Sequence, residues 1–320
     1  MKRIAVLTSG GDAPGMNAAI RSVVRIGNAR GLEVVGVHYG YKGLVEKDFH
    51  LMKPRDVSGL LEKGGTALMT SRDEDFKSAE YQYKAIDNLK SEGIEGLVVI
   101  GGNGSQTGNL SIAEKGFRTM GVASTIDNDL WGTDYTIGFD TAVNTAIQAI
   151  DKIRDTATSH ARSFVIEVMG RDKGFIALDA GLASGADIVL VPEVKFDIQK
   201  IIENIKNGIA KNKMHHMIVC AEGAIHAQDL EKLIKSHIQD VDIRISVLGY
   251  IQRGGSPTRF DRIIATLFAE EAVNQLLMGE SGKLVGIRDN KITLIPLEDA
   301  VKKEKRINYD LYRTIEEVSV

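Results

Sequence analysis

The stretch VVIGGNGSQTG, residues 98–108, joins an apolar run to two glycines, which are followed by Asn103, Gly104 and Ser105. The apolar run predicts a strand. A glycine-rich turn at its carboxyl end is typical of a phosphate-binding loop, because glycine lets backbone N–H groups approach an anion. Magnesium–phosphate sites usually carry a carboxylate in such a turn, whereas this one carries an amide. The stretch therefore predicts a phosphate-binding α/β fold and raises the question of what Asn103 does there.

Similar apolar runs recur along the chain, with helical patterns between them. This alternation predicts an α/β fold with mainly parallel sheets, and continuously apolar strands are expected where helices cover both faces. The helix predicted after GTDYTIGFD is long and is the expected bridge between two halves of the chain. Strands are predicted within residues 3–9, 33–39, 96–102, 121–127, 163–170, 187–193, 216–223 and 244–250, and helices within 16–29, 81–93, 141–157 and 259–277.

Composition sets the class of protein. The chain has 320 residues, 43% hydrophobic and 26% charged, which is long enough for two domains of an ordinary globular protein. A net charge of −3 gives no reason to expect a nucleic-acid partner, and no stretch has the length of a membrane span. The single cysteine, Cys220, lies in an apolar run, so a buried small residue in a reducing cytoplasm is favoured over a nucleophile.

Two further loops carry chemistry-bearing residues after predicted strands. In TSGGDAPGMNAAIR, residues 8–21, two glycines follow the strand and Pro14 stands near the start of a helix, as in an anion-binding helix N-terminus. In TIDNDLWGTD, residues 125–134, Asp127 and Asp129 lie two apart, with a third acid at Asp134. Such carboxylates suit a general base and a metal-linked acceptor, and an isolated D-N-D would instead be an Asx-rich turn.

Arginines and acids are scattered near the ends of the remaining predicted strands. Arginine binds phosphate bidentately, so several of them following separate parallel strands indicate an anionic substrate. Arg244 lies inside a predicted strand, where an unpaired charge is costly, so it is expected to pair with a ligand phosphate or a protein carboxylate. The set consists of Arg162, the triplet at 169–171, AEG at 221–223, Arg244 and Arg253 in QRGGSPT.

Together these motifs resemble the bacterial ATP-dependent 6-phosphofructokinase family over essentially the whole chain. The matching segments are TSGGDAPGMNAAIR, TIDND, DKIRDTATSHARSFVIEVMGR, AEG and QRGGSPT, in the family's order and spacing. The resemblance implies a cytoplasmic homotetramer whose subunits have two doubly wound α/β domains, with active sites at subunit boundaries. The ATP-binding domain would be residues 1–138 plus about 252–304, and the fructose 6-phosphate-binding domain 139–251 plus about 305–320.

The resemblance also implies a role for each matching residue. Asp127 would be the general base for the sugar 1-hydroxyl, while Thr125, Arg171 and the backbone of Gly11 would stabilise the transferring phosphoryl group. Asn103 and Asp129 would serve Mg²⁺. The nucleotide-binding set would be Gly11, Arg72, Asp73, Gly102, Asn103, Gly104, Ser105 and Gly108; the substrate-binding set would be Thr125, Asp127, Arg162, Met169, Gly170, Arg171, Glu222, Arg244, Tyr250 and Arg253, with Arg162 and Arg244 coming from a neighbouring subunit.

An effector site for ADP or phosphoenolpyruvate is implied as well. Basic residues on helices are more often only solvated charges, so solvated surface charge stays open as the alternative interpretation of this set. Its members would be Arg21, Arg25, Arg154, Asp187, Lys211 and Lys213.

The chain departs from the family pattern near both substrate sites. Asn103 replaces the aspartate of GGDGS, Tyr250 stands where the family has a histidine, and Ser124 follows Ala123 in place of Pro-Gly. Phe175 replaces a usual acid, and the segment beside Arg72 is unusual. Three functions therefore stay open: an ATP-dependent phosphofructokinase impaired at Asn103 and Tyr250, a weakly catalytic or non-catalytic regulatory paralogue, or a kinase for a related ketohexose phosphate such as tagatose 6-phosphate.

Overall fold

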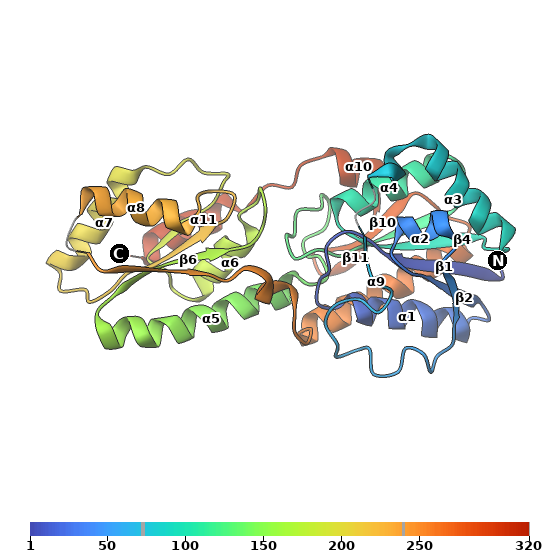
Figure 1. Cartoon of the computed structure of the whole chain (residues 1–320), viewed down its shortest axis with the longest axis horizontal. Helices are drawn as coiled ribbons and strands as arrows, with labels where there is room; N and C mark the ends of the chain where they lie inside the picture. The colour runs from blue at the N-terminus through green and yellow to red at the C-terminus, as the bar shows by residue number, and fades with distance from the viewer. Residues whose placement is uncertain (72–73, 239–240, 320) are drawn as a thin grey trace. The chain divides into compact units, whose positions relative to one another are not determined.

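The computed structural model describes residues 1–71, 74–238 and 241–319, which form two compact units (Figure 1). Unit 1 consists of Met1–Thr141 and Arg253–Lys305, and unit 2 of Ala142–Gln252 and Arg306–Val320. The predicted domain ranges lie close to these bounds, and the ligand assigned to each domain stays a prediction. Helix α5 (Phe139–His160) begins in unit 1 and continues into unit 2. The prediction that a long helix after GTDYTIGFD joins the two halves of the chain is therefore confirmed.

Unit 1 is built on a seven-stranded sheet in the order β11-β10-β5-β4-β1-β2-β3. The inner pairs are parallel, whereas β2 with β3 and β10 with β11 are antiparallel. The central strand β4 is buried at every position, as its apolar sequence predicts. The strands are β1 (Arg3–Thr8), β2 (Glu33–Val37), β3 (Phe49–Met52), β4 (Gly96–Gly101), β5 (Thr119–Ala123), β10 (Lys283–Arg288) and β11 (Lys291–Pro296).

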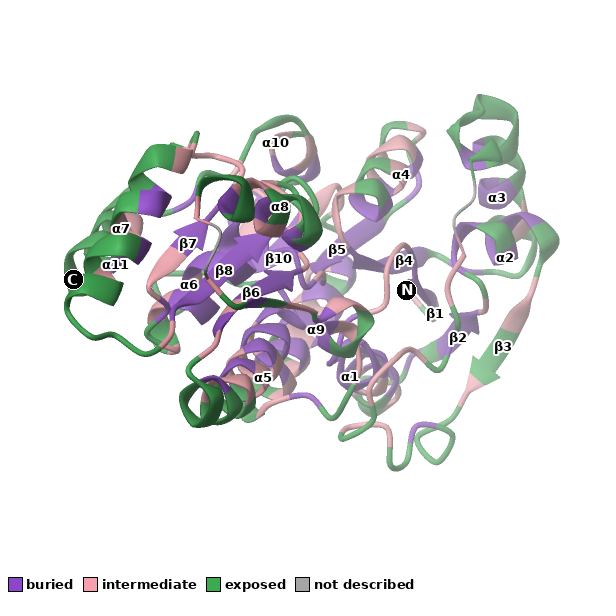
Figure 2. Cartoon of the chain, turned by 60° about the vertical axis from the view of Figure 1, so that its left-hand side comes forward, coloured by how far each residue is buried: buried purple, intermediate pink, exposed green. Residues whose placement is uncertain are grey.

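Helices cover both faces of the unit 1 sheet (Figure 1). Helices α1 and α9 pack against each other on one face, and α2, α3, α4 and α10 lie on the other. Their inward residues are buried together with the strands, as the purple parts of the ribbon in Figure 2 show, and many of them are apolar. The helices are α1 (Met16–Ala29), α2 (Tyr41–Glu46), α3 (Ala79–Ser91), α4 (Asn103–Glu114), α9 (Arg259–Leu277) and α10 (Leu297–Lys302), with the 3₁₀ turn η1 (Asp75–Lys77).

Unit 2 has a four-stranded, fully parallel sheet in the order β7-β8-β6-β9. Cys220 lies in its core, where burial raises the pKa of the thiol to about 12, so the predicted inert, buried cysteine is confirmed. The strands are β6 (Ser163–Val168), β7 (Ile188–Leu190), β8 (Met217–Ala221) and β9 (Ile243–Val247). The helices are α6 (Phe175–Ala183), α7 (Ile198–Ala210), α8 (Ala227–His237) and α11 (Tyr309–Val318), with the 3₁₀ turn η2 (Gly249–Arg253) at the boundary of the units.

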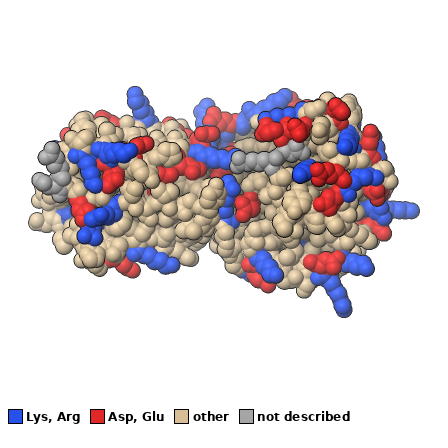
Figure 3. Space-filling model, viewed as in Figure 1, with Lys and Arg blue, Asp and Glu red and all other residues tan. Residues whose placement is uncertain are grey.

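All eight predicted strands and all four predicted helices are confirmed, and the α/β class with mainly parallel sheets is correct. Strands β3, β10 and β11 were not predicted. On the face shown in Figure 3, acidic and basic side chains are interspersed, in keeping with the small net charge. None of the helices within the described ranges combines the length and apolar content needed to cross a bilayer.

Candidate functional site

Three loops of unit 1 that were predicted separately lie at one edge of its sheet. Strands β5, β4 and β1 are parallel neighbours, so their carboxyl ends meet at the same edge, where ligands bind in open α/β sheets. The β4 and β1 loops touch: a Cβ on Gly101 would lie 2.7 Å from the carbonyl oxygen of Ser9. Glycine is therefore needed at 101 for the β4 loop to approach the β1 loop.

Asn103 and Asp129, the two predicted magnesium residues, are in direct contact. The side-chain amide of Asn103 donates a hydrogen bond to Asp129 Oδ2 at 2.7 Å. This bond orients the amide, because a flipped Asn103 would point its carbonyl oxygen at the carboxylate. In the absence of metal, the neutral donor satisfies part of the Asp129 charge, a task that a second carboxylate could not perform.

The D-N-D turn presents its carboxylates through the conformation of its central residue. Asn128 has a left-handed backbone with φ 52°, and its side chain donates to the carbonyl oxygen of Asp134 at 3.0 Å. The backbone N–H of Asp127 donates to Thr125 Oγ1 at 3.1 Å, and Asp127 is only 5% exposed. The turn is therefore shaped by the Thr125 hydroxyl and by Asn128, and Asp129 lies beside the β4 loop; the catalytic and metal-binding roles of the two carboxylates stay predictions.

Asp134, the third acid of this segment, does not join the pair. Its carboxylate accepts from the backbone N–H of Asp289 at 2.8 Å, and its own N–H donates to the carbonyl oxygen of Ile287 at 2.7 Å. Asp134 thus fastens the loop to strand β10 and its turn.

The β1 loop meets Arg253, which the resemblance assigned to sugar phosphate. A Cβ on Gly11 would lie 3.2 Å from a terminal nitrogen of Arg253, and Asp12 Oδ1 lies 3.7 Å from the other. Gly11 therefore keeps the guanidinium against the loop, where Asp12 partly balances its charge. Because the Arg253 side chain is only 16% exposed, its geometry is held by packing.

The residues of the β4 loop differ in what their surroundings require. Gly104 faces open space, since nothing lies within 4 Å of a Cβ placed there. A Cβ on Gly108 would lie 2.7 Å from the ring of Tyr41, so packing alone accounts for that glycine. Ser105 Oγ is buried and accepts or donates no hydrogen bond within the described part of the chain. It is therefore an unsatisfied polar atom in this loop.

In unit 2, Glu222 ties together two loops that follow strands β6 and β8. Its Oε1 accepts from the backbone N–H of Gly170 at 3.2 Å and from that of Arg171 at 2.8 Å. Arg171 has φ 53°, and a Cβ on Gly223 would lie 2.0 Å from its carbonyl oxygen. The neighbouring Met169 N–H points to the side chain of Gln252 at 3.4 Å. These contacts bring four of the predicted substrate residues, namely Met169, Gly170, Arg171 and Glu222, into one cluster.

Arg162 comes just before a strand, so it does not belong with the arginines expected after strands, whereas the prediction that Arg244 lies inside a strand is confirmed. Arg162 directly precedes β6, and Arg244 is the second residue of β9, so both lie at the amino end of the unit 2 sheet. Both pair with one carboxylate, Asp242, with N–O distances of 2.7 Å and 3.0 Å. The expected partner of Arg244 is therefore a protein carboxylate, although its half-exposed side chain is not forced to pair by burial.

Two of the departures from the family pattern are absorbed by packing. Ser124 is fully buried, does not have a positive φ, and donates weakly to the carbonyl oxygen of Ile137 at 3.4 Å. Phe175 is 7% exposed and begins helix α6 within the core of unit 2. Tyr250 is different, because it lies in η2 with 78% of its surface exposed.

The predicted effector residues fall into both units. Arg21 and Arg25 are on α1 of unit 1, where Arg25 reaches the carbonyl oxygen of Pro54 at 3.5 Å. In unit 2, Arg154 donates to the carbonyl oxygen of Gly185 at 3.2 Å, and Lys213 pairs with Asp187; Lys211 is the exposed C-cap of α7.

His215, which the sequence interpretation missed, lies within the electrostatic reach of Arg154, Asp187 and Lys213. Burial and the two cations hold its pKa below the usual value, against the opposing effect of Asp187. Two of the predicted nucleotide residues, Arg72 and Asp73, lie outside the described residues.

Comparison with known proteins agrees with this geometry. The phosphofructokinase family model matches residues 3–276. The chain is 50% identical to the ATP-dependent 6-phosphofructokinase of Lysinibacillus sphaericus and 51% identical to that of Halalkalibacterium halodurans, in both cases over 320 residues and 100% of each chain. Its fold is similar to the T-state crystal structure of Pichia pastoris phosphofructokinase, with a TM-score of 0.89 and 35% identity over 99% of this chain and 39% of that chain. With a matching family model over most of its length and relatives at this identity, the chain belongs to the phosphofructokinase family.

Proposed function

We propose that the chain is an ATP-dependent 6-phosphofructokinase, which transfers the γ-phosphoryl group of ATP to the 1-hydroxyl of fructose 6-phosphate. The observation that carries the proposal is the meeting of the β1, β4 and β5 loops at one sheet edge, with Asp127 and Asp129 beside two glycine-rich turns. The names of the full-length relatives support the same reaction. The products are fructose 1,6-bisphosphate and ADP.

The residues of unit 1 fit the needs of phosphoryl transfer, which are positioning and charge neutralisation. Asp127 accepts the proton of the sugar 1-hydroxyl as the hydroxyl oxygen bonds to the γ-phosphorus. The bond between the γ-phosphorus and the oxygen that bridges it to the β-phosphorus breaks, and that oxygen leaves with ADP. Gly11 presents its backbone N–H, and Thr125 its hydroxyl, to the transferring group. The nearly buried setting of Asp127 excludes water from the proton transfer.

Asn103 and Asp129 provide hard oxygen donors of the kind that Mg²⁺ takes, so the pair fits the cation that accompanies ATP. The carboxylate of Asp129 would hold the ion, and Asn103 would contribute its carbonyl oxygen once its amide turns. Mg²⁺ would neutralise charge on the phosphates. Because the pair carries one negative charge instead of two, we expect weaker metal binding than with a second aspartate.

The test is ADP release from Mg-ATP with and without fructose 6-phosphate, over wide ranges of sugar and metal concentration. Saturable, sugar-dependent turnover that is lost in Asp127→Asn is the expected result. A folded protein without turnover at saturating substrates would instead support a regulatory paralogue that binds sugar phosphate or nucleotide.

A kinase for a related ketohexose phosphate is the second candidate, and Tyr250 is the observation that favours it. A large, neutral, 78% exposed side chain replaces a residue that could become cationic. A panel of fructose 6-phosphate and tagatose 6-phosphate, compared by kcat/KM, separates the two activities. A Tyr250→His variant that shifts the ratio towards fructose 6-phosphate would assign the preference to this side chain.

The proposal extends to a cytoplasmic homotetramer with an effector site for ADP or phosphoenolpyruvate. The support for a neighbouring subunit is that Arg162 and Arg244 lie at the amino end of the unit 2 sheet, whereas Glu222 and Arg171 lie at its carboxyl end. One sugar phosphate cannot reach both ends of this sheet within a subunit. Light scattering of the purified protein tests the tetramer, and activity titrations with ADP and phosphoenolpyruvate in wild type and Lys213→Gln test the effector site.

A further inference from the structure

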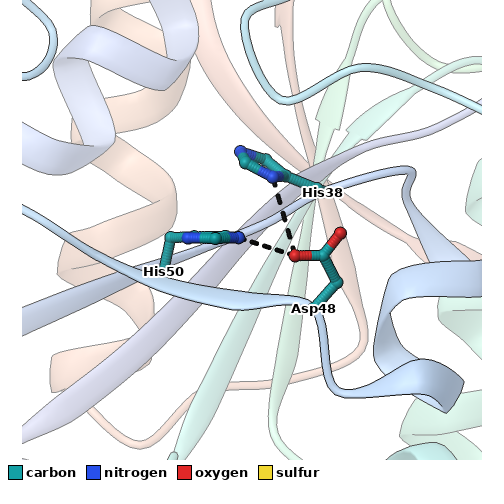
Figure 4. Close-up of side chains that lie close together, drawn as sticks. All are labelled: His38, Asp48 and His50. Carbon is teal, nitrogen blue, oxygen red and sulfur yellow. Dashed lines mark hydrogen bonds and ion pairs between the residues drawn. The ribbon is translucent and has the colours of Figure 1, made fainter.

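Two histidines and an aspartate gather on unit 1 at the hairpin-like pairing of strands β2 and β3 (Figure 4). His50 Nε2 lies 2.6 Å from Asp48 Oδ1, and His38 Nδ1 lies 3.6 Å from the same oxygen. One nitrogen from each ring and one carboxylate oxygen lie within 4.8 Å of one another. Within the described part of the chain, this is the one group of three or more histidine, cysteine or acidic side chains so arranged.

The strand register explains why these side chains converge. In the antiparallel pair, Val37 opposes Phe49 and Gly36 opposes His50, and the N–H of His38 donates to the carbonyl oxygen of Asp48 at 3.1 Å. His38 therefore stands opposite Asp48, and His50 lies two residues further along the same strand face. The backbone itself holds three metal-ligating residue types on one side of the sheet.

The donor distances suit a small divalent ion. Zinc binds imidazole nitrogen and carboxylate oxygen at about 2.0–2.2 Å, so tetrahedral donors stand roughly 3.3–3.5 Å apart. The two nitrogen–oxygen distances lie on either side of that spacing. Side-chain rotations that move the donor atoms by roughly 1 Å would therefore bring all three to an ion. The imidazole rings lie with their centroids 4.1 Å apart and tilted by 30°, and a nitrogen of each ring faces Asp48 Oδ1 (Figure 4).

The chemistry of the donors selects the class of ion. Two imidazoles and one carboxylate suit zinc and its transition-metal neighbours, whereas Mg²⁺ prefers oxygen donors alone. The side chains of His38, Asp48 and His50 are 33%, 34% and 54% exposed, so an ion can reach them and water can complete its coordination. A hydrogen bond between His50 and Asp48 alone would not account for His38, whose Nδ1 is too far away for a good bond to the same oxygen.

We propose that His38, Asp48 and His50 form a binding site for one divalent transition-metal ion of the zinc class, separate from the Asn103–Asp129 pair. The ion would join the end of β2 to the edge strand β3, whose one hydrogen-bonded neighbour among the described strands is β2. The residues after His38 lead to the phosphate loops: a Cβ on Gly40 would lie 2.8 Å from the carbonyl oxygen of Thr8, and the hydroxyl of Tyr41 donates to the carbonyl oxygen of Ser105.

The test uses the full-length protein after removal of metal by chelation and dialysis. Zn²⁺ binding is measured by calorimetry in excess Mg²⁺, and Co²⁺ binding by its visible absorption, which reports coordination geometry. We expect one equivalent of each ion to bind and Zn²⁺ to raise Tm. His50→Gln and Asp48→Asn should each weaken binding by at least about tenfold, the scale on which metal sites respond to altered surroundings.

The matched control is His160→Asn, which removes an exposed histidine at the end of α5, far along the chain from the cluster. It should bind zinc as wild type does. Melting curves without metal show whether each variant is folded, and Asp48→Asn serves if His50→Gln is not. Absence of zinc binding by the wild type overturns the proposal. Equal binding by wild type, His50→Gln and Asp48→Asn also overturns it.

Discussion

Replacing Asn103 with aspartate should make unit 1 less stable without metal and more responsive to Mg²⁺. Asn103 donates to Asp129 at 2.7 Å, so Asn103→Asp removes a charge-assisted hydrogen bond and puts two carboxylates side by side. Two like charges about 4 Å apart repel by about 1 kcal/mol in water and about 4 kcal/mol at the effective dielectric of a protein surface. Because both side chains are partly exposed, we expect a net loss of about 2 kcal/mol.

Mg²⁺ should reverse this loss, because the two carboxylates would hold the ion and its charge would offset their repulsion. Each tenfold excess of ion over its dissociation constant returns about 1.4 kcal/mol to the folded state. Tm measured by calorimetry should therefore fall by about 4–8 °C without metal, on the scale known for units of about this size, and recover as Mg²⁺ is added. The Tm of wild type should rise less steeply with Mg²⁺ concentration. Turnover should need less Mg²⁺ in the variant than in wild type.

The control exchanges the two side chains. Asn103→Asp combined with Asp129→Asn restores one amide and one carboxylate, so metal-free stability should return towards wild type, and the double-mutant cycle isolates the pair. If Asn103→Asp alone is as stable as wild type without metal and its Mg²⁺ response is unchanged, the reasoning about this pair is refuted.

Three further changes probe other parts of the fold. Burial raises the pKa of Asp261 from 3.8 to about 6, so the folded state holds its proton more tightly than the unfolded chain. Its contribution, about 3 kcal/mol, is therefore present below about pH 4 and lost as the pH rises through about 6. Asp261→Asn should lack this dependence, so the wild-type-minus-variant difference in free energy of urea unfolding should fall across that range, and parallel curves would contradict it. Gly223→Ala places a methyl 2.0 Å from the carbonyl oxygen of Arg171, so a drop in Tm and a raised KM for sugar phosphate are expected, whereas wild-type values would mean that this loop yields easily. Ser105→Ala removes a buried hydroxyl that lacks a protein partner, so Tm should hold or rise while the Kd for ATP increases; unchanged ATP affinity would mean that the hydroxyl meets no ligand.

The sequence predicts the buried strands well because continuous apolar runs report burial on both faces. Strand β3, FHLM, is a half-exposed edge strand and gives no such run. The β10–β11 hairpin did carry a signal that was overlooked: Asp289 and Asn290, both with positive φ, form the turn between two mixed runs.

The site is predictable to the extent that its residues come directly after buried strands. Asn103, Asp127 and Gly11 were all expected on that ground, although their meeting depends on the β5-β4-β1 order, which periodicity does not encode. Arg244 was correctly expected inside a strand, but only the observed start of that strand at Ile243 shows that the side chain is at the amino end of the sheet. The His38–Asp48–His50 cluster was out of reach because it depends on the register of a strand that was not predicted.

The order in which the units are completed along the chain has a consequence for biosynthesis. Strand β10, which pairs with β5, and helix α9, which packs on α1, are made only after the whole of Ala142–Gln252, and α11 of unit 2 is made after both of them. A nascent chain that stops at residue 252 would therefore expose the edge of β5 and the apolar face of α1. Neither unit can finish folding until its segment after residue 252 has been translated. Stalled or truncated chains of this protein should consequently be marked substrates for chaperones and proteases.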